Sequence, residues 1–284
     1  MTNSLLLHER TSTLVDKLTG KLPQALIVEG PSGIGVRAIS KQLAISMGSP
    51  LLVIEPKKMA KGQMEVDHKE GNIIIEDIRR LYEQTRTRQP NAQVYILDTG
   101  ERSMTAGAQN AFLKLLEEPR EGLHFIIATH HVDQLLPTIR SRAQKLSLLP
   151  ISDQQTTQLV ASLGIKDSTK QARLAFVGRG LPALTKRLAG DEKAYEARVA
   201  IMTDAKLLIS GSMYEKLLVV HKYKDNRADA LTLIDDANHQ LMVAVQKNPD
   251  QKLIMGIDNR LKARERIQTG GNIRLQLAVA CYNT

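Results

Sequence analysis

The chain has 284 residues, of which 42% are hydrophobic, 24% charged and 3% aromatic, with a net charge of +9 and a single cysteine, Cys281. This composition is typical of a globular protein with two or three domains. The single cysteine excludes a disulfide framework and a four-cysteine zinc module, and the low aromatic content argues against a site of stacked aromatic rings. The first 25 residues do not read as a signal sequence and no eighteen apolar residues run together, so we expect a cytoplasmic protein without a membrane span.

The first half of the chain alternates apolar, β-rich runs with segments of helical periodicity. We expect strands at 25–30, 51–56, 94–98 and 123–129. We expect helices at 36–48, within 73–87 and at 105–119, the last ended by Pro119. Regular alternation of this kind favours an α/β fold, a parallel sheet with helices on both faces.

The pattern changes after about residue 149. Helical periodicity is found at 153–164 and 169–188, joined by glycine, and every periodic segment from 191 onward is helical. We therefore predict three domains: an α/β domain over 1–150, a small helical lid over 151–190 and an all-helical domain over 191–284.

Residues 30–37 read GPSGIGVR and join the first strand to the first helix. A phosphate-binding loop reads G-x-x-x-x-G-K-S/T, in which backbone N–H groups hold the phosphates, the lysine adds charge and the hydroxyl positions magnesium. Here Val36 replaces the lysine and Arg37 the hydroxyl. Two interpretations remain: a vestigial nucleotide site that includes Gly30, Gly33 and Gly35, or a glycine-rich turn without a ligand.

Asp98 ends the apolar strand VYILD, the place from which a nucleotide site would organise magnesium. ATPases of this type usually follow that aspartate with a glutamate that activates water, but the next residue is Thr99 and Glu101 is the nearest substitute. With lysine, hydroxyl and glutamate all missing, we expect weak ATP binding and no hydrolysis. No cofactor is expected to be required and no metal site is expected, although some residual binding of ATP or ADP is compatible with the loop.

The segments TAGAQNAFLKLLEEP (105–119) and FIIATHHVDQLLPTIRSRA (125–143) resemble bacterial clamp-loader subunits of the AAA+ class. That family shows a helix ending N-A-L-L-K-x-L-E-E-P, a strand ending A-T and a closing S-R-C. The matching residues here run from Asn110 to Pro119, then Ala128 and Thr129, then Ser141 to Ala143. The resemblance extends to 23–35, 177–190 and 272–280, and the degenerate loop and missing glutamate match the delta-prime type of DNA polymerase III, which does not hydrolyse ATP.

The resemblance implies that Arg142 reaches in trans to the γ-phosphate of ATP on a neighbouring subunit. Its partners would be gamma/tau and delta loader subunits, the sliding clamp and primed DNA, contacted through phosphates. Taken alone, Arg142 reads as a solvated surface arginine, and Arg140 is its nearest rival. The net charge suits a phosphate-bearing partner and a solvated basic surface equally.

Other positions leave alternatives open. Thr129 and His130 lie where the family senses nucleotide, but both also suit capping of a strand end. Pro182 and Ala183 lie where hydrolysing relatives carry a nucleotide-contacting arginine, which Arg179 only precedes.

The chain departs from the family pattern at two places. Residues 48–72 contain His68 and no cysteine where many bacterial loaders insert a zinc module, and Ala143 replaces the cysteine of S-R-C. The competing hypotheses are an ATP-hydrolysing gamma-type subunit and a small-molecule kinase.

Overall fold

The computed structural model describes residues 6–48, 51–60, 62–86, 92–118, 121–248 and 250–282. Pro119, expected to end a helix, lies outside these residues. The chain divides into two compact units, Met1–Arg187 and Leu188–Thr284. The first unit contains the predicted α/β domain and most of the predicted lid, so the three-domain division stays a prediction. Within the described parts of the chain, no helix is long and apolar enough to span a membrane.

The first unit is built on a five-stranded sheet in which every neighbouring pair is parallel. In order across the sheet, the strands are β2 (Leu51–Ile54), β5 (Gln93–Asp98), β6 (Leu123–Thr129), β1 (Ala25–Glu29) and β7 (Gln144–Ser147). The four strands predicted from sequence are all present, and the α/β fold is confirmed. β7 was not expected, because its sequence QKLS buries only Leu146.

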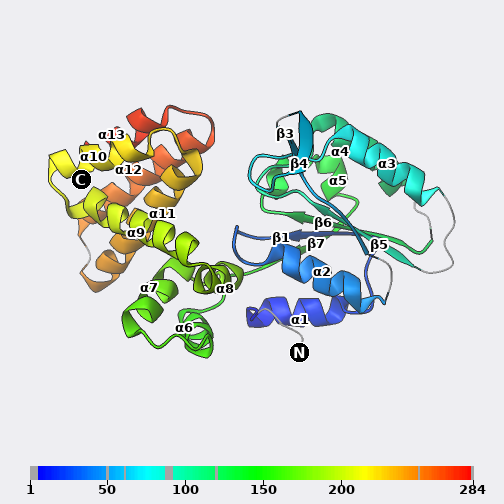
Figure 1. Cartoon of the computed structure of the whole chain (residues 1–284), viewed down its shortest axis with the longest axis horizontal. Coiled ribbons are helices and arrows are strands. Elements are labelled where there is room, and N and C mark those ends of the chain that lie inside the picture. The colour runs from blue at the N-terminus through cyan, green and yellow to red at the C-terminus, as the bar shows by residue number, and fades with distance from the viewer. Residues whose placement is uncertain are drawn as a thin grey trace. The chain divides into compact units, whose positions relative to one another are not determined.

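Helices cover both faces of this sheet (Figure 1). In β1, Leu26 and Val28 pack in one hydrophobic cluster with α1 (Glu9–Leu18) and α2 (Val36–Ser46). Ile27, which points the other way, packs in a second cluster with α3 (Ile75–Thr85), α4 (Ala106–Glu117) and α5 (Pro137–Arg140). Successive side chains of a strand point to opposite faces, so a continuous apolar run is what a doubly covered strand requires.

Short connecting elements complete the α/β part. An antiparallel hairpin, β3 (Lys57–Ala60) and β4 (Gln63–Val66), occupies much of the region where relatives were expected to insert a zinc module. A single 3-10 turn, η1 (Val132–Gln134), leads from β6 into α5.

Three helices follow the sheet: α6 (Asp153–Ser162), α7 (Ser168–Gly178) and α8 (Pro182–Gly190). The turn before α8 is anchored near the end of the sheet domain, because Gly180 accepts a hydrogen bond from Ile151 N (3.0 Å) and donates one to Thr156 Oγ1 (3.2 Å).

The described residues of the second unit are helical, in agreement with the sequence. Its five long helices are α9 (Glu192–Ser210), α10 (Met213–Tyr223), α11 (Arg227–Lys247), α12 (Gln251–Gln268) and α13 (Ile273–Tyr282). They share one apolar core, which includes Cys281, and burial raises the pKa of its thiol to about 11. Asp236 of α11 is fully buried, and its two carboxylate oxygens accept hydrogen bonds from the two terminal nitrogens of the Arg198 guanidinium. The distance from Nη2 to Oδ1 is 2.7 Å.

The Arg198–Asp236 pair predicts a large effect of removing one partner. Asp236→Ala would leave a buried guanidinium without its carboxylate, and we expect it to lower the free energy of unfolding of this unit by about 3–5 kcal/mol. The neighbouring Asp235→Ala is the matched control, because Asp235 and Arg264 form a half-exposed pair worth less than about 1 kcal/mol. Urea unfolding followed by far-UV circular dichroism would check this, and equal midpoints for the two variants would contradict it.

Candidate functional site

The candidate site lies at the carboxyl ends of three neighbouring strands. The parallel registers place Glu29 beside Thr129 and Asp98 beside Ala128, so the ends of β1, β6 and β5 lie side by side. The glycine-rich loop leaves this edge after β1 and enters α2 directly. Ligands of open α/β sheets bind at this kind of edge.

The loop needs its glycines for two different reasons. Gly35 begins α2 with φ at 110°, and Gly33 has φ at 87°, both in the left-handed region that favours glycine. A side chain on Gly33 would also place its Cβ 2.7 Å from Leu184 Cβ. Gly30 is crowded too, since its Cβ would lie 2.9 Å from the side chain of Ile34.

Leu184 of α8 packs against the glycine-rich loop at Gly33. Its N–H donates to the carbonyl oxygen of Gly33 at 2.8 Å. In a phosphate-binding loop the backbone N–H groups face the phosphate; here the first turn of α8 packs against the same loop, at the carbonyl oxygen and Cα of Gly33. Val36, which replaces the expected lysine, is buried in the sheet core.

Arg37, which replaces the expected hydroxyl, brings together three residues from different parts of the chain. Its guanidinium donates to Glu55 Oε1 and to His68 Nε2 (3.0 Å), and its Nε lies 3.3 Å from Asp98 Oδ2. Because a guanidinium can only donate, His68 Nε2 must accept, which leaves the ring proton on Nδ1, 3.6 Å from Asp98 Oδ2. The Arg37 guanidinium and the Nδ1–H group of His68 therefore both face Asp98 Oδ2, the first with a full positive charge and the second with the positive end of its N–H dipole.

Asp98 is 5% exposed and depends on these neighbours. Its Oδ1 accepts the N–H of Gly100 at 3.1 Å, while Oδ2 accepts no hydrogen bond from any described residue. The charge on Oδ2 is compensated by the Arg37 guanidinium. A buried carboxylate without such a cation is costly.

The loop after β4 contributes His68 to the site. His68 is held there because its carbonyl oxygen accepts from Glu101 N at 2.7 Å and lies 2.4 Å from where a Cβ on Gly100 would be. The turn itself is fixed by Asp67, whose pKa is lowered below its usual range by hydrogen bonds from the N–H groups of Glu70 and Lys69. Glu101 accepts a hydrogen bond from Ser32 Oγ in the glycine-rich loop.

These residues do not fit a magnesium ion. In the described ranges, no three His, Cys, Asp or Glu side chains are arranged to hold a metal. Arg37 already carries a positive charge beside Asp98 and Glu55, and a second cation there would be repelled. Glu55 and His68 were missed in the sequence analysis, although an arginine in place of the hydroxyl is a signal that carboxylate partners should be sought at strand ends.

The polar residues at the ends of β5 and β6 are engaged within the fold. Thr129 Oγ1 accepts the N–H of His131 at 3.1 Å, and His130 Nδ1 lies 2.8 Å from the carbonyl oxygen of Gly30. Thr99 is buried and its hydroxyl donates to Ala128 O at 3.1 Å. These contacts are those of strand-end capping, the alternative to nucleotide sensing.

Arg179 ends α7 with φ at 29°, and its guanidinium lies 5.7 Å from the centre of the Phe176 ring. Pro182 and Ala183 begin α8 and directly precede Leu184, which contacts the glycine-rich loop. At this contact the lid presents the backbone N–H and the apolar side chain of Leu184.

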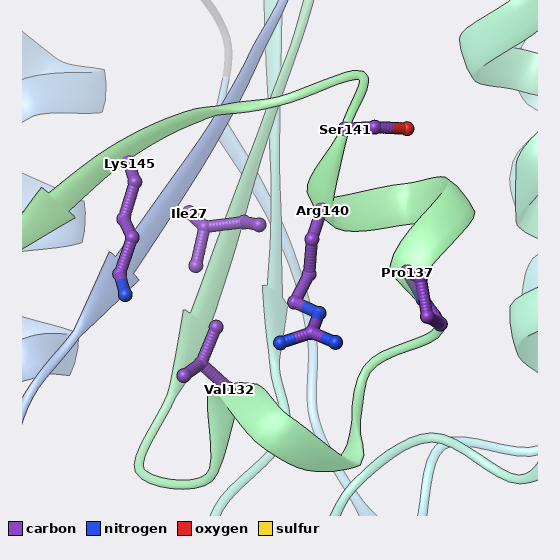
Figure 2. Close-up of a pocket in the computed structure, with 6 residues that line it drawn as sticks. All are labelled: Ile27, Val132, Pro137, Arg140, Ser141 and Lys145. Atoms are coloured by element: carbon purple, nitrogen blue, oxygen red, sulfur yellow. The ribbon is translucent and has the colours of Figure 1, made fainter.

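The two candidate arginines diverge at the end of α5, of which Arg140 is the last residue and beyond which Arg142 lies two positions along the chain. Arg140 lines a pocket of about 350 Å³, in which Ile27 and Val132 lie between Arg140 on one side and Lys145 on the other (Figure 2). Its guanidinium lies 3.4 Å from Asp133. Arg142 turns instead to α4, where its Nη2 lies 3.2 Å from Glu117 Oε1. Both arginine side chains are 40% exposed, so exposure does not separate them.

Comparison with known proteins shows which family this sequence matches. Residues 10–152, half of the chain, match the family described as DNA polymerase III, delta subunit. The chain is 27% identical to DNA polymerase III subunit delta' of Pseudomonas aeruginosa over 205 residues, 65% of this chain and 61% of that protein. It is 33% identical to DNA polymerase III subunit gamma/tau of Mycobacterium bovis over 138 residues, 43% of this chain and 24% of that protein. The matches thus span less than two thirds of these relatives.

A crystal structure of a gamma subunit-related DNA polymerase III protein from Thermotoga maritima has a similar fold. The TM-score is 0.54 at 21% identity, and the match covers 96% of this chain and 97% of that one. At this identity the likeness concerns the fold alone, and it confirms the predicted arrangement of a parallel α/β sheet followed by helices.

Removal of the Arg37 guanidinium would leave Asp98 Oδ2 buried without the cation that now lies 3.3 Å from it. We expect Arg37→Ala to lower the free energy of unfolding by about 1–3 kcal/mol at neutral pH, because a buried acceptor loses its compensation. Arg37→Lys keeps the charge but cannot reach Glu55, His68 and Asp98 together, so an intermediate loss is expected. Urea unfolding of the three proteins measures both effects, and a fully stable Arg37→Ala protein would contradict the assigned role.

Proposed function

The chain belongs to the DNA polymerase III delta subunit family, and we propose that it is a clamp-loader subunit of the delta-prime type that does not hydrolyse ATP itself. In this role it completes the loader ring and contributes an arginine to ATP bound by a neighbour. The relatives named delta' support this type.

The observation that carries the proposal is the ion-pair cluster of Arg37. Hydrolysis needs a cation that bridges the phosphates and a residue that orients water. In this chain a protein guanidinium lies against Asp98 and Glu55, and Thr99 follows Asp98. Stable compensation of Asp98 by the chain itself removes its need for a metal ion.

The lid supports the same conclusion for nucleotide binding. Leu184 packs against the loop that would hold phosphates, with its N–H on the carbonyl oxygen of Gly33 and its side chain beside the Gly33 Cα. Binding of ATP with magnesium at Asp98 would have to displace Arg37. We therefore propose that no cofactor is required and that binding of ATP or ADP is weak.

The partners follow from the family role. We propose that the protein assembles with gamma/tau and delta subunits, acts on the sliding clamp and contacts primed DNA through phosphates. Apolar side chains exposed on α10 and α13 suit contacts with other subunits; they are Tyr214, Leu217, Leu218, Leu275 and Val279.

A second candidate is the ATP-hydrolysing gamma/tau type. Its support is the 33% identity to the Mycobacterium bovis protein, above the 27% found with the Pseudomonas aeruginosa delta' subunit. Because that match lies within 138 residues of the shared α/β domain, identity alone does not distinguish the two types, and ATP turnover does.

ATP hydrolysis by the isolated chain and by a reconstituted loader tests the proposal. We expect the isolated chain to show no turnover, and Arg142→Ala to slow the loader on clamp and primed DNA at least about tenfold, since an arginine finger is worth about 10³–10⁵ at the site that it serves. Arg140→Ala is the matched control and should leave turnover within about twofold of wild type. Turnover by the isolated chain would favour the gamma/tau type instead.

DNA binding offers an independent check. Contacts with phosphates alone predict that the assembled loader binds primed DNA without sequence preference and that the affinity falls steeply as salt rises from 50 to about 200 mM. The isolated chain should bind weakly under the same conditions. A sequence-specific footprint by the isolated chain in a nuclease-protection assay is the result that this interpretation does not allow.

A further inference from the structure

Arg142 is anchored at two of its nitrogens by its own chain. Nη1 donates to the carbonyl oxygen of Thr138 at 3.2 Å, and Nη2 lies 3.2 Å from Glu117 Oε1. Thr138 lies within α5, whereas Glu117 is the last residue of α4. The guanidinium is therefore attached to two helices that pack on the same face of the sheet.

These contacts leave most of the guanidinium available. An arginine side chain has five N–H donors, of which one on Nη1 makes the hydrogen bond to Thr138, while Nη2 faces Glu117 as an ion pair. The side chain remains 40% exposed, so donors that these contacts do not use can reach an acceptor outside the chain. An anion such as phosphate accepts two parallel N–H groups from such a fork.

Arg140, the last residue of α5, provides a comparison two positions earlier in the chain. Its acidic neighbour, Asp133, is 94% exposed and lies 3.4 Å away. A freely solvated aspartate holds a partner less firmly than Glu117 and the Thr138 carbonyl together hold Arg142, because two anchors from different elements fix the direction of the guanidinium. An arginine that is ordered before it meets its ligand loses less side-chain entropy on binding.

We propose that Glu117 is a positioning residue for Arg142: it orders the guanidinium before the neighbouring subunit's ATP is engaged. The proposal rests on the proposed function, in which Arg142 acts in trans. Glu117 does not touch the nucleotide. Its contribution is to orientation, since a half-exposed ion pair adds little to the stability of the fold.

The test measures steady-state ATP turnover by the reconstituted loader with clamp and primed DNA. We expect Glu117→Ala to lower kcat about three- to tenfold with KM for ATP and the yield of assembled loader unchanged, because orientation matters most in the transition state. Glu117→Gln keeps an oxygen that can accept from Arg142 and should remain within about twofold of wild type. Glu118→Ala is the matched control, since Glu118 is the next residue and is also exposed.

The double variant Glu117→Ala/Arg142→Ala separates positioning from a merely structural role. A positioning residue acts only through Arg142, so the double variant should be no slower than Arg142→Ala alone. An equal further loss in the Arg142→Ala background would overturn the proposal, and so would a Glu117→Ala loader as fast as, or faster than, wild type. If Arg142→Ala itself leaves turnover unchanged in an intact loader, the trans role of the proposed function fails, and the positioning role fails with it.

Discussion

A buried carboxylate at the end of a central strand needs a positive charge beside it, and the arrangement of the site follows from how this chain supplies that charge. Asp98 ends β5 with 5% exposure, and the nearest cation is Arg37 from the first turn of α2. Because the guanidinium has five donors, it also binds Glu55 after β2 and His68 after β4. Arg37 thereby connects α2, the end of the edge strand β2 and the loop after β4 to the end of β5.

The glycine-rich loop is also held by contacts within the protein. Its carbonyl groups need hydrogen-bond donors, which a phosphate, itself an acceptor, would not supply. Leu184 N donates to Gly33 O and the His130 ring binds Gly30 O, so two carbonyl groups of the loop find partners within the protein. Gly33 remains necessary because its φ of 87° favours glycine and because the Leu184 side chain occupies the place where a Cβ would stand.

Much of the fold could be predicted because its signals are local. The four strands predicted from the sequence, β1, β2, β5 and β6, are apolar runs, and the helices between them show clear helical periodicity. β7 was missed because it is an edge strand whose Gln144 and Lys145 are exposed, and the β3–β4 hairpin because β4 is exposed along its whole length. The partners of Arg37 could not be read in the same way, since they lie 18, 31 and 61 residues along the chain and only the fold brings them together. Asp98 and the glycines could be found because each occupies a position that the loop or strand end defines locally.

Arg37 and Arg142 show how surroundings decide what an arginine can do. Arg37 lies against two carboxylates and an imidazole, so its charge is balanced and its terminal nitrogens are directed inward. Arg142 meets one carboxylate and one carbonyl oxygen, which fix its direction without using all its donors. Both guanidinium side chains are 40% exposed, so burial alone would treat them as equivalent. The number and charge of the acceptors around each one account for the difference: the first neutralises a charge within its own chain, and the second keeps donors for an anion supplied by another.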